Sequence, residues 1–451
     1  MIKVDLIAHT SELPNNLISH AAKTCYSSKV PEMGKQIDAE AYLFNTGHHT
    51  TFQHTFFTFC IDGLSVAAAT FGLHLNHPFY NTDQRSGRYS KMYDKPDFDE
   101  IEAYIKKYWP QEKCIQDVMD FIKAGVEIFH DNIERGTKVV EDAIKEERPF
   151  VNDEYIEKQA KKIAQEQLRN FVSLIAPMAL DFTINLSALT AMYRSAWSPE
   201  MREMTQQMVD AVVAKYPELA YAFKIEVRRD KDWAPKFNFK NIAIRKEPGV
   251  ELIYADVNNI NSKHNTKDSV DLGYFDPENM VNNTKTVKSK VEVSCATMGQ
   301  DQRHRAIKRT APEFTGNFYM PYVLQELGLE SKVLEFFEMY KDLCSKISPT
   351  LATAIAPYGA MVSYEKSVDV NGLTHEQEKR TCWCAQEEIY YLSVLLRKEI
   401  EKKHGSDCEL LSLLSPACYK TGKCIEGRRY CGRNLKDRLD SGKDYFPKRK
   451  V

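Results

Sequence analysis

The sequence predicts an α+β protein made of two successive halves of similar fold and a short tail. Three observations support this prediction: strand and helix signals occur in both halves, two short landmarks recur in the same order, and the last residues are basic and rich in cysteine. We expect a first domain at 1–230, a second domain at 231–403 and a tail at 404–451.

Length and composition limit the class of protein. A chain of 451 residues is too long for one ordinary core and suits two or three domains. Its 43% hydrophobic and 27% charged residues are typical of a soluble globular protein. The net charge of −2 disfavours nucleic acid as the main partner. We expect a cytoplasmic protein that does not enter a membrane, because no apolar run reaches about 18 residues and no secretory leader is recognisable.

The first half begins with mixed signals and then becomes helical. Residues 49–64 are rich in Thr and Phe, which predicts a strand that enters a turn at Asp62-Gly63. Apolar residues at helical spacing predict a helix over 117–129, and a second helix is expected at about 154–175. We interpret these apolar stripes as core packing.

The second half starts after a polar, turn-rich region. The change of composition places the boundary between the halves near 225–240. A short strand at 290–296 leads into a charged loop at 300–316, and helices are expected from there to about 403.

Two landmarks indicate an internal repeat. Leu174-Ile-Ala-Pro177 recurs as Ala354-Ile-Ala-Pro357, and Arg194-Ser-Ala-Trp197 recurs as Arg380-Thr-Cys-Trp383. The order is the same in both halves although the spacing differs, which favours duplication over chance.

Two basic segments could hold phosphate groups. The sequence has neither G-x-G-x-x-G nor G-x-x-x-x-G-K, so arginines would have to hold any phosphate. One segment, 300–309, contains Arg303-His304-Arg305 directly after the expected strand, and it could bind an anion or be a solvated charge run. The other, 84–88, offers a hydroxyl, a flexible glycine and guanidinium groups, and it could bind phosphate or be a surface turn.

These two segments resemble the signature of the flavin-dependent thymidylate synthases, R-H-R-x-x-S-x-x-x-x-S-x-R-Y. The first half is similar to its end, Ser86-Gly87-Arg88-Tyr89, and the second half is similar to its start, Arg303-His304-Arg305. Each half keeps what the other has lost. Residues 47–54 also resemble the family's G-H-x-[ST]-x-x-E-H stretch, and residues 380–389 resemble its late helix motif.

The resemblance implies two fused copies of the family's domain, each a mixed sheet packed with long helices. It also implies an FAD-dependent methylation of dUMP to dTMP with methylene-tetrahydrofolate and NADPH as co-substrates. The active site would be composed from both halves, and the chain would form a homodimer that imitates the family's tetramer.

The resemblance also assigns roles to residues. Arg380 is the expected catalytic residue, since a fixed cation can stabilise charge that develops on the pyrimidine. The expected FAD contacts are Arg303, His304, Arg305, Thr50 and His375. The expected nucleotide contacts are Gln84, Ser86, Gly87, Arg88 and Gln300.

Departures from the family pattern leave other functions open. Ser173 and Thr353 occupy positions where the family has an arginine that helps to hold phosphate. The alternatives are flavin-dependent hydroxymethylation of a pyrimidine nucleotide, in which water traps the same methylene intermediate, and a non-catalytic paralogue that only binds flavin or nucleotide.

The 11 cysteines are expected to be mostly free thiols, with one possible exception in the tail. Cys408, Cys418, Cys424 and Cys431 fall within 24 residues and could form a tetrahedral zinc site. Free cysteines are the alternative, because the spacing lacks a C-x-x-C knuckle. A metal site at His48, His49 and His54 is disfavoured, since no carboxylate completes the set.

Overall fold

The computed structural model describes residues 1–75, 80–87, 95–148, 150–227, 233–263, 266–432 and 446–451, and it divides into two compact units. Unit 1 consists of Met1–Ile115, Leu174–Ala234 and Ile347–Ile355. Unit 2 consists of Gln116–Ser173, Pro235–Lys346 and Ala356–Val451. The units therefore interleave along the chain: the helical stretch after residue 115 belongs with the second half, and the tail is part of unit 2.

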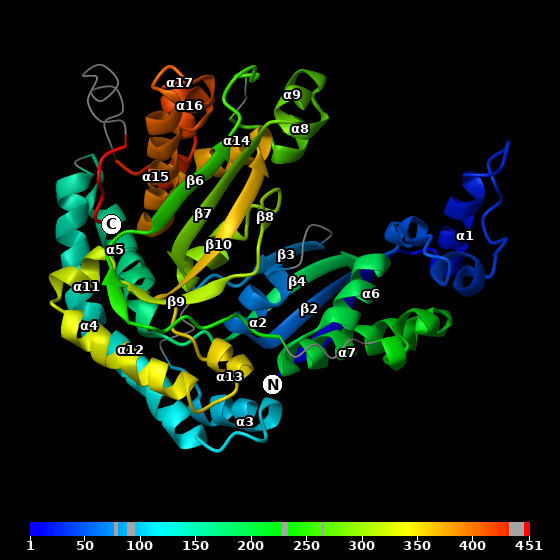
Figure 1. Cartoon of the computed structure of the whole chain (residues 1–451), viewed down its shortest axis with the longest axis horizontal. Helices are drawn as coiled ribbons and strands as arrows, with labels where there is room; N and C mark the ends of the chain where they lie inside the picture. The colour runs from blue at the N-terminus through cyan, green and yellow to red at the C-terminus, as the bar shows by residue number, and fades with distance from the viewer. Residues whose placement is uncertain (76–79, 88–94, 149, 228–232, 264–265, 433–445) are drawn as a thin grey trace. The chain divides into compact units, whose positions relative to one another are not determined.

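Unit 1 is built on a four-stranded sheet with the strand order β1-β2-β4-β3 (Figure 1). Its strands are β1 (Lys3–His9), β2 (Phe56–Ser65), β3 (Tyr80–Gln84) and β4 (Pro177–Asn185). All three pairings are antiparallel, so this sheet is not mixed as the resemblance implied. The strand expected at 49–64 begins later, because a 3-10 turn precedes it. It continues past Gly63 with an irregular register instead of turning there.

Helical segments make up the rest of unit 1. They are α1 (Pro14–Thr24), η1 (Glu40–Phe44), η2 (His49–His54), α2 (Val66–Phe71), η3 (Leu73–Leu75), α3 (Phe98–Tyr108), α6 (Leu186–Ser195), α7 (Pro199–Lys215), η5 (Pro217–Phe223), η6 (Ile225–Val227) and α13 (Pro349–Ala354). Helix α7 packs against β1 and β2. Alternate residues of β2 point into this interface, so that Phe57, Phe59 and Ile61 are fully buried.

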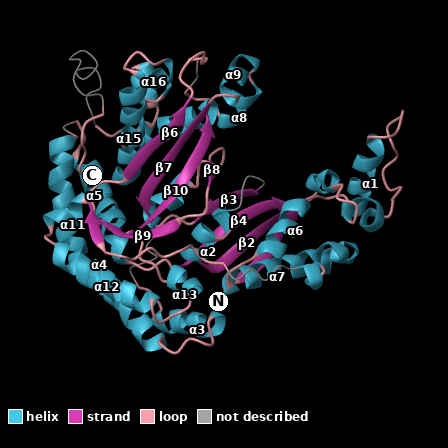
Figure 2. Ribbon diagram, viewed as in Figure 1, coloured by secondary structure: helices cyan, strands magenta, loops and turns pink. Residues whose placement is uncertain are grey.

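Unit 2 contains a six-stranded sheet with the order β5-β9-β10-β7-β6, in which β8 also pairs with β10 (Figure 2). Its strands are β5 (Ala243–Arg245), β6 (Gly249–Ala255), β7 (Thr286–Ser294), β8 (Lys308–Arg309), β9 (Glu313–Tyr319) and β10 (Ala360–Asp369). Strand β5 runs parallel to β9 and the other pairs are antiparallel, so this sheet is mixed as expected.

The helices of unit 2 include two long ones from the first half of the sequence. They are α4 (Ile115–Glu147), α5 (Asp153–Leu168), η4 (Arg169–Phe171), α8 (Val270–Phe275), η7 (Pro277–Asn279), α9 (Met280–Asn283), α10 (Cys295–Asp301), α11 (Tyr322–Glu326), α12 (Glu330–Cys344), α14 (Val370–Arg380), α15 (Glu387–His404), α16 (Glu409–Leu413), α17 (Ala417–Thr421) and η8 (Gly427–Arg429). Helices α4 and α12 meet where the rings of Phe121 and Phe336 stack at 4.6 Å, and α15 packs against β6 and β7. None of the helices in the described ranges is long and apolar enough to cross a membrane.

The two sheets share a strand order. In unit 1 the path is β1-β2-β4-β3, and in unit 2 the equivalent path is β6-β7-β10-β9. Ser65 ends β2 and caps α2, as Ser294 ends β7 and caps α10. Asn185 ends β4 and caps α6, as Asp369 ends β10 and caps α14. In both units a short polar side chain thus closes the strand and starts the helix.

A buried glutamate accompanies the capping serine in each unit. Ser65 is a hydrogen-bond partner of Glu200, near the start of α7. Ser294 donates its backbone N–H to Glu388, near the start of α15, at 2.7 Å. Both carboxyl groups are fully buried, and burial raises the pKa of each to about 7.

The tail contributes to the core of unit 2. Leu410, Leu411 and Leu413 of α16 are buried in one cluster with Leu252 of β6 and Val368 of β10. The tail therefore shares the hydrophobic core of unit 2.

Candidate functional site

The R-H-R segment lies in the turn that follows α10. The backbone N–H of His304 donates to the carbonyl of Asp301 at 3.1 Å, which keeps the turn tight. His304 is buried, whereas Arg303 is exposed and Arg305 is half-buried. The segment therefore presents guanidinium groups on either side of a buried imidazole.

Arg380, the last residue of α14, is fixed against this turn. Its Nε donates to Nε2 of His304 at 2.8 Å, and its Nη2 donates to the carbonyl of Gln300 at 2.7 Å. The ring of His375, one turn earlier in α14, lies edge-on to the ring of His304 at 5.8 Å. The structure thus brings together four residues that the sequence singled out.

His304 is neutral in this arrangement. Burial, and then the charge of Arg380, hold the pKa of His304 well below its usual value. Because Nε2 accepts a hydrogen bond from Arg380, the ring proton lies on Nδ1. A neutral imidazole can therefore orient the guanidinium without competing with it for an anion.

A buried ionic network lies behind the turn. The carboxylate of Asp301 accepts from Arg309 Nε at 2.5 Å, from Lys366 Nζ at 2.6 Å and from the Tyr364 hydroxyl at 2.9 Å. Lys366 also bonds Glu376 at 2.6 Å. Burial alone would raise the pKa of Asp301, but Arg309 and Lys366 together hold it well below its usual value.

The network joins the elements that carry the site. Asp301 belongs to α10, Arg309 to β8, Lys366 to β10 and Glu376 to α14. Sequence reasoning missed this role: it treated Arg309 as part of a basic cluster for an anion, whereas its guanidinium bonds Asp301 and backbone carbonyls inside the fold. The alternation of β10, which buries Lys366, was the available signal.

Gln300 has a structural contact as well. Its side-chain amide donates to the Gln386 side chain at the start of α15, which also accepts from Arg169 Nη2 at 3.2 Å. The predicted nucleotide contact is thus also part of a link between α10 and α15.

The remaining predicted residues lie in unit 1. Thr50 is exposed in η2. Gln84 is the last residue of β3 and pairs with Leu180, and Ser86 and Gly87 are half-buried in the segment that follows. Arg88 lies outside the described residues. The contacts expected of these residues with FAD and nucleotide remain predictions.

The structure separates the four tail cysteines that were expected to form a zinc site. Cys408 packs against the leucine-rich cluster that contains α16. Cys418, Cys424 and Cys431 instead line a different, small cavity. Among the residues with described positions, no three His, Cys, Asp or Glu side chains form a group that could hold a metal ion. Cys408 directly precedes α16 and packs with the leucines of that helix, which is why it lies apart from the other three cysteines.

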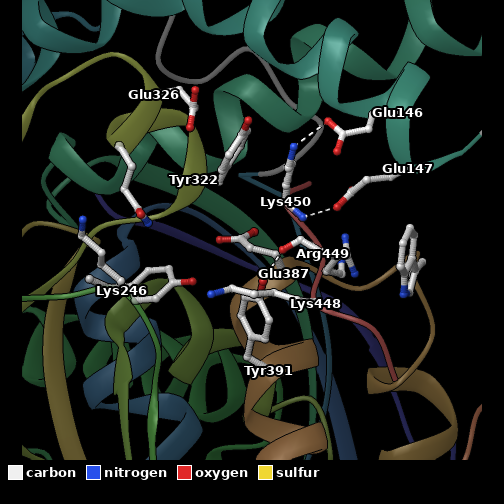
Figure 3. A pocket seen from close by; sticks show the side chains of 13 residues that line it. Glu146, Glu147, Lys246, Tyr322, Glu326, Glu387, Tyr391, Lys448, Arg449 and Lys450 are labelled. Carbon is white, nitrogen blue, oxygen red and sulfur yellow. Dashed lines mark hydrogen bonds and ion pairs between the residues drawn. The ribbon is translucent and has the colours of Figure 1, made fainter. Parts of the chain in front are cut away.

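Unit 2 also contains a larger cavity of about 550 Å³, which is the size of a small-molecule pocket (Figure 3). It lies between the end of α4, α11, the start of α15 and residues 448–450. Its charged lining residues are Glu146, Glu147, Glu326, Glu387, Lys246, Lys448, Arg449 and Lys450. The two signs of charge are mixed, so the cavity is not a simple anion site.

Two buried groups stand out in this cavity. Glu387 and Arg449 are 2% and 4% exposed, and Oε1 of the former and Nη1 of the latter have no hydrogen-bond partner within the described part of the chain. Burial, and then the neighbouring Glu166, raise the pKa of Glu387 to about 8. At neutral pH Glu387 is therefore mostly a neutral acid that can donate a hydrogen bond, beside a buried cation.

Comparison with known proteins supports the resemblance. Residues 5–218 match the family model described as "Thymidylate synthase complementing protein". The flavin-dependent thymidylate synthase of Clostridium tetani (strain Massachusetts / E88) is 27% identical over 231 residues, which are 48% of this chain and 85% of that protein.

Two solved structures have a low similarity to the chain. Thymidylate Synthase X from Helicobacter pylori, solved with FAD and dUMP, is 18% identical, with 51% of this chain and 100% of that chain covered and a TM-score of 0.30. The UMP/dUMP methylase PolB from Streptomyces cacaoi is 15% identical, with 49% and 94% covered and a TM-score of 0.34. The match over residues 5–218, slightly less than half of the chain, confirms the resemblance that the motifs predicted, and this part of the chain is similar to the thymidylate synthase complementing protein family.

Proposed function

We propose that the protein methylates dUMP to dTMP with FAD as cofactor, methylene-tetrahydrofolate as the carbon donor and NADPH as the reductant. The proposal rests on the similarity of residues 5–218 to the family and on the name of the Clostridium tetani relative. Within the chain it rests on the arrangement of Arg380, His304 and Gln300 in unit 2.

The fixed guanidinium of Arg380 is the observation that carries the proposal. When a pyrimidine ring is attacked, electron density builds at its N3 and O4 side, and a cation held in place there lowers the barrier. Arg380 is held by the ring of His304 and by a backbone carbonyl, so it need not reorganise during the reaction. Its direct action on the pyrimidine is a proposal.

The residues around this turn suit a dinucleotide such as FAD. Arg303 is exposed and Arg305 is half-buried. One guanidinium group can bind two oxygens of a phosphate at once. We propose these two residues with His304 and His375 as flavin contacts in unit 2, and Thr50 as one in unit 1. When bound, FAD supplies the redox chemistry that the side chains lack.

We further propose that the nucleotide site draws on both halves of the sequence. Gln84, Ser86, Gly87 and Arg88 would hold the phosphate, and Gln300 would contact the nucleotide. The support is the complementary loss of motifs: a chain that keeps S-G-R-Y in one half and R-H-R in the other retains one full signature.

The same reasoning extends to a duplication of the family's domain. The shared strand order, the capping Ser65 and Ser294, and their buried partners Glu200 and Glu388 support two related copies. These features are hydrogen-bonded details at equivalent points of two sheets, which separate folds would seldom reproduce together.

The experiment is incubation of purified protein with FAD, dUMP, methylene-tetrahydrofolate and NADPH, followed by identification of the nucleotide product by mass. We expect dTMP, and we expect Arg303→Ala to lose FAD binding while Arg88→Ala loses nucleotide binding. A hydroxymethylated nucleotide would replace the proposal by the alternative reaction. Protein that takes up no FAD and forms no product would indicate a non-catalytic paralogue.

A further inference from the structure

Five cysteines from two neighbouring segments of the sequence line one cavity in unit 2. They are Cys382, Cys384, Cys418, Cys424 and Cys431. The cavity measures about 20 Å³, which is room for about one water molecule. The first two cysteines lie in the loop between α14 and α15, and the other three come from the tail. Nearly half of the chain's 11 cysteines thus meet at one place.

The loop holds Cys382 and Cys384 against each other. The backbone N–H of Ala385 donates to the carbonyl of Cys382 at 3.0 Å, which closes a tight turn. Within this turn the backbone N–H of Cys384 donates to the sulfur of Cys382 at 3.5 Å. The Cys384 thiol contacts the same sulfur and also donates to the carbonyl of Arg429 at 3.1 Å. The sulfur of Cys382 is therefore an acceptor, which favours its thiolate form.

We propose that Cys382 and Cys384 form a redox-active dithiol that is oxidised to an intramolecular disulfide by a small peroxide or a small disulfide. Cys382 is the attacking thiol and Cys384 is the resolving thiol. The proposal concerns the thiol chemistry of this loop and does not depend on the proposed function.

The reaction with peroxide balances in two steps. The Cys382 thiolate attacks one peroxide oxygen, the O–O bond breaks, and the products are a sulfenic acid and hydroxide, which is then protonated. The Cys384 sulfur then attacks the sulfenic sulfur, an S–S bond forms, and water leaves. Two thiols thus lose two electrons and two protons, and the peroxide is reduced to two molecules of water.

The electrostatics of the cavity agree with these roles. The hydrogen bond from Cys384 lowers the pKa of Cys382 to about 7, and that same contact with burial raises the pKa of Cys384. A thiol with a pKa near ambient pH is the best attacking group, because it combines a large thiolate fraction with good nucleophilicity. Both cysteines are partly accessible to solvent, as an oxidant requires.

The loop connects the proposed active site with the larger cavity. Arg380 lies two residues before Cys382, and Gln386, which contacts Gln300, lies two residues after Cys384. Trp383, between the two cysteines, lies under the guanidinium of Arg449 at 5.5 Å and lines the 550 Å³ cavity. Closing a disulfide here would therefore constrain the segment that links α14 and α15.

The test is mass mapping of the full-length protein after mild oxidation. Trypsin releases residues 381–397 as one peptide that contains Cys382 and Cys384 and no other cysteine. After reduction, removal of reductant, and treatment with one equivalent of hydrogen peroxide, we expect this peptide to lose two hydrogens and to regain them with dithiothreitol. At pH 7 Cys382 should also react with iodoacetamide about tenfold faster than an ordinary exposed thiol.

Two variants separate the proposal from general thiol oxidation. Cys384→Ser should leave Cys382 as a sulfenic acid that dimedone traps, whereas Cys408→Ser, outside the cavity, should leave the disulfide unchanged. Oxidation spread evenly over all cysteines would overturn the proposal, as would disulfides confined to Cys418, Cys424 and Cys431. Tightly bound zinc that blocks alkylation of Cys382 would overturn it as well.

Discussion

The guanidinium of Arg380 is oriented by two acceptors that differ in kind, a neutral imidazole and a backbone carbonyl. A lysine at this position would keep the charge but would lose the planar fork that makes both bonds. We therefore expect Arg380→Lys to lower kcat about hundredfold or more, in the range measured for single donors that stabilise developing charge. The KM for dUMP should change much less, because the interaction strengthens in the transition state.

The measurement is steady-state kinetics of dTMP formation together with FAD absorbance of the purified variant. Lys379→Ala is the matched control, because Lys379 is the exposed neighbour in the same helical turn. Retained FAD with a lost kcat supports the role of Arg380. Unchanged kcat in Arg380→Lys would show that the guanidinium is not part of the chemistry.

The raised pKa of Glu387 predicts how the free energy of unfolding depends on pH. Its folded-state pKa of about 8 lies above the usual 4.5, so the folded protein binds the proton more tightly than the unfolded chain. Between these two values the free energy of unfolding should fall as pH rises, by about 1.4 kcal/mol per pH unit for this group. Below pH 4.5 the stabilisation from the proton on Glu387 is constant, and above about pH 8 that stabilisation is lost.

Glu387→Gln tests this by staying neutral at every pH. Urea unfolding between pH 5 and 8 should show a shallower fall in stability for the variant than for the parent protein. Glu330→Gln is a control, since Glu330 is an acid of the same unit whose side chain is 44% exposed and pairs with Lys246 at 3.7 Å. Parallel pH profiles for Glu387→Gln and the parent would contradict a raised pKa at this site.

At the scale of elements, the buried ionic network of Asp301, Arg309, Lys366 and Glu376 links α10, β8, β10 and α14 around the site. Lys366 is 4% exposed at its side chain and bonds two carboxylates, Asp301 and Glu376. Lys366→Met would leave Asp301 with one cation fewer in a buried setting. We expect a loss of about 3–5 kcal/mol in the free energy of unfolding, because removing one partner strands a buried charge.

An exposed ion pair on the same sheet provides the control for that prediction. Lys288 on β7 bonds Glu365 on β10 at 2.6 Å, with both side chains about two-fifths exposed. Lys288→Met should cost less than about 1 kcal/mol, since solvent screens such pairs. Equal losses for the two variants in urea unfolding of the whole chain would contradict the structural role of the network.

The regular elements were largely predictable from the sequence, whereas their assignment to units was not. Apolar spacing predicted helices at 117–129 and 154–175, and the structure has α4 and α5 there, although α5 ends at Leu168. Nothing in the local pattern of these helices indicates that they belong with unit 2. Amphipathic periodicity reports that a face is buried, not which sheet buries it.

In the site, too, the residues that belong to motifs were predictable from the sequence, whereas the residues of the buried ionic network were not. His304 and Arg380 were predicted from motifs 76 residues apart in the sequence, and the structure joins them by a hydrogen bond. Asp301, Lys366 and Glu376 were not predicted, because a charged residue in a sequence is by default an exposed one. The contacts of Lys366 with Asp301 and Glu376 show that these charges face one another inside the fold.

At the scale of the whole molecule, the complementary motifs raise the question of which chain completes which site. The proposed site needs Arg303 from a second half and Arg88 from a first half, and these could come from one chain or from two chains of a homodimer. A C2 dimer with shared sites would contain two of them, each using opposite halves of the two chains.

Mixing two inactive variants decides between these possibilities. Arg88→Ala and Arg303→Ala chains each have an intact copy of the segment that the other lacks. If sites form between chains, random exchange makes half of the dimers mixed, and each mixed dimer has one intact site of two, so about a quarter of the parent activity should return. The measurement is dTMP formation after mixed refolding, with each variant refolded alone as the control. If each site forms within one chain, the mixture should remain as inactive as its components, because no chain in it carries both arginines.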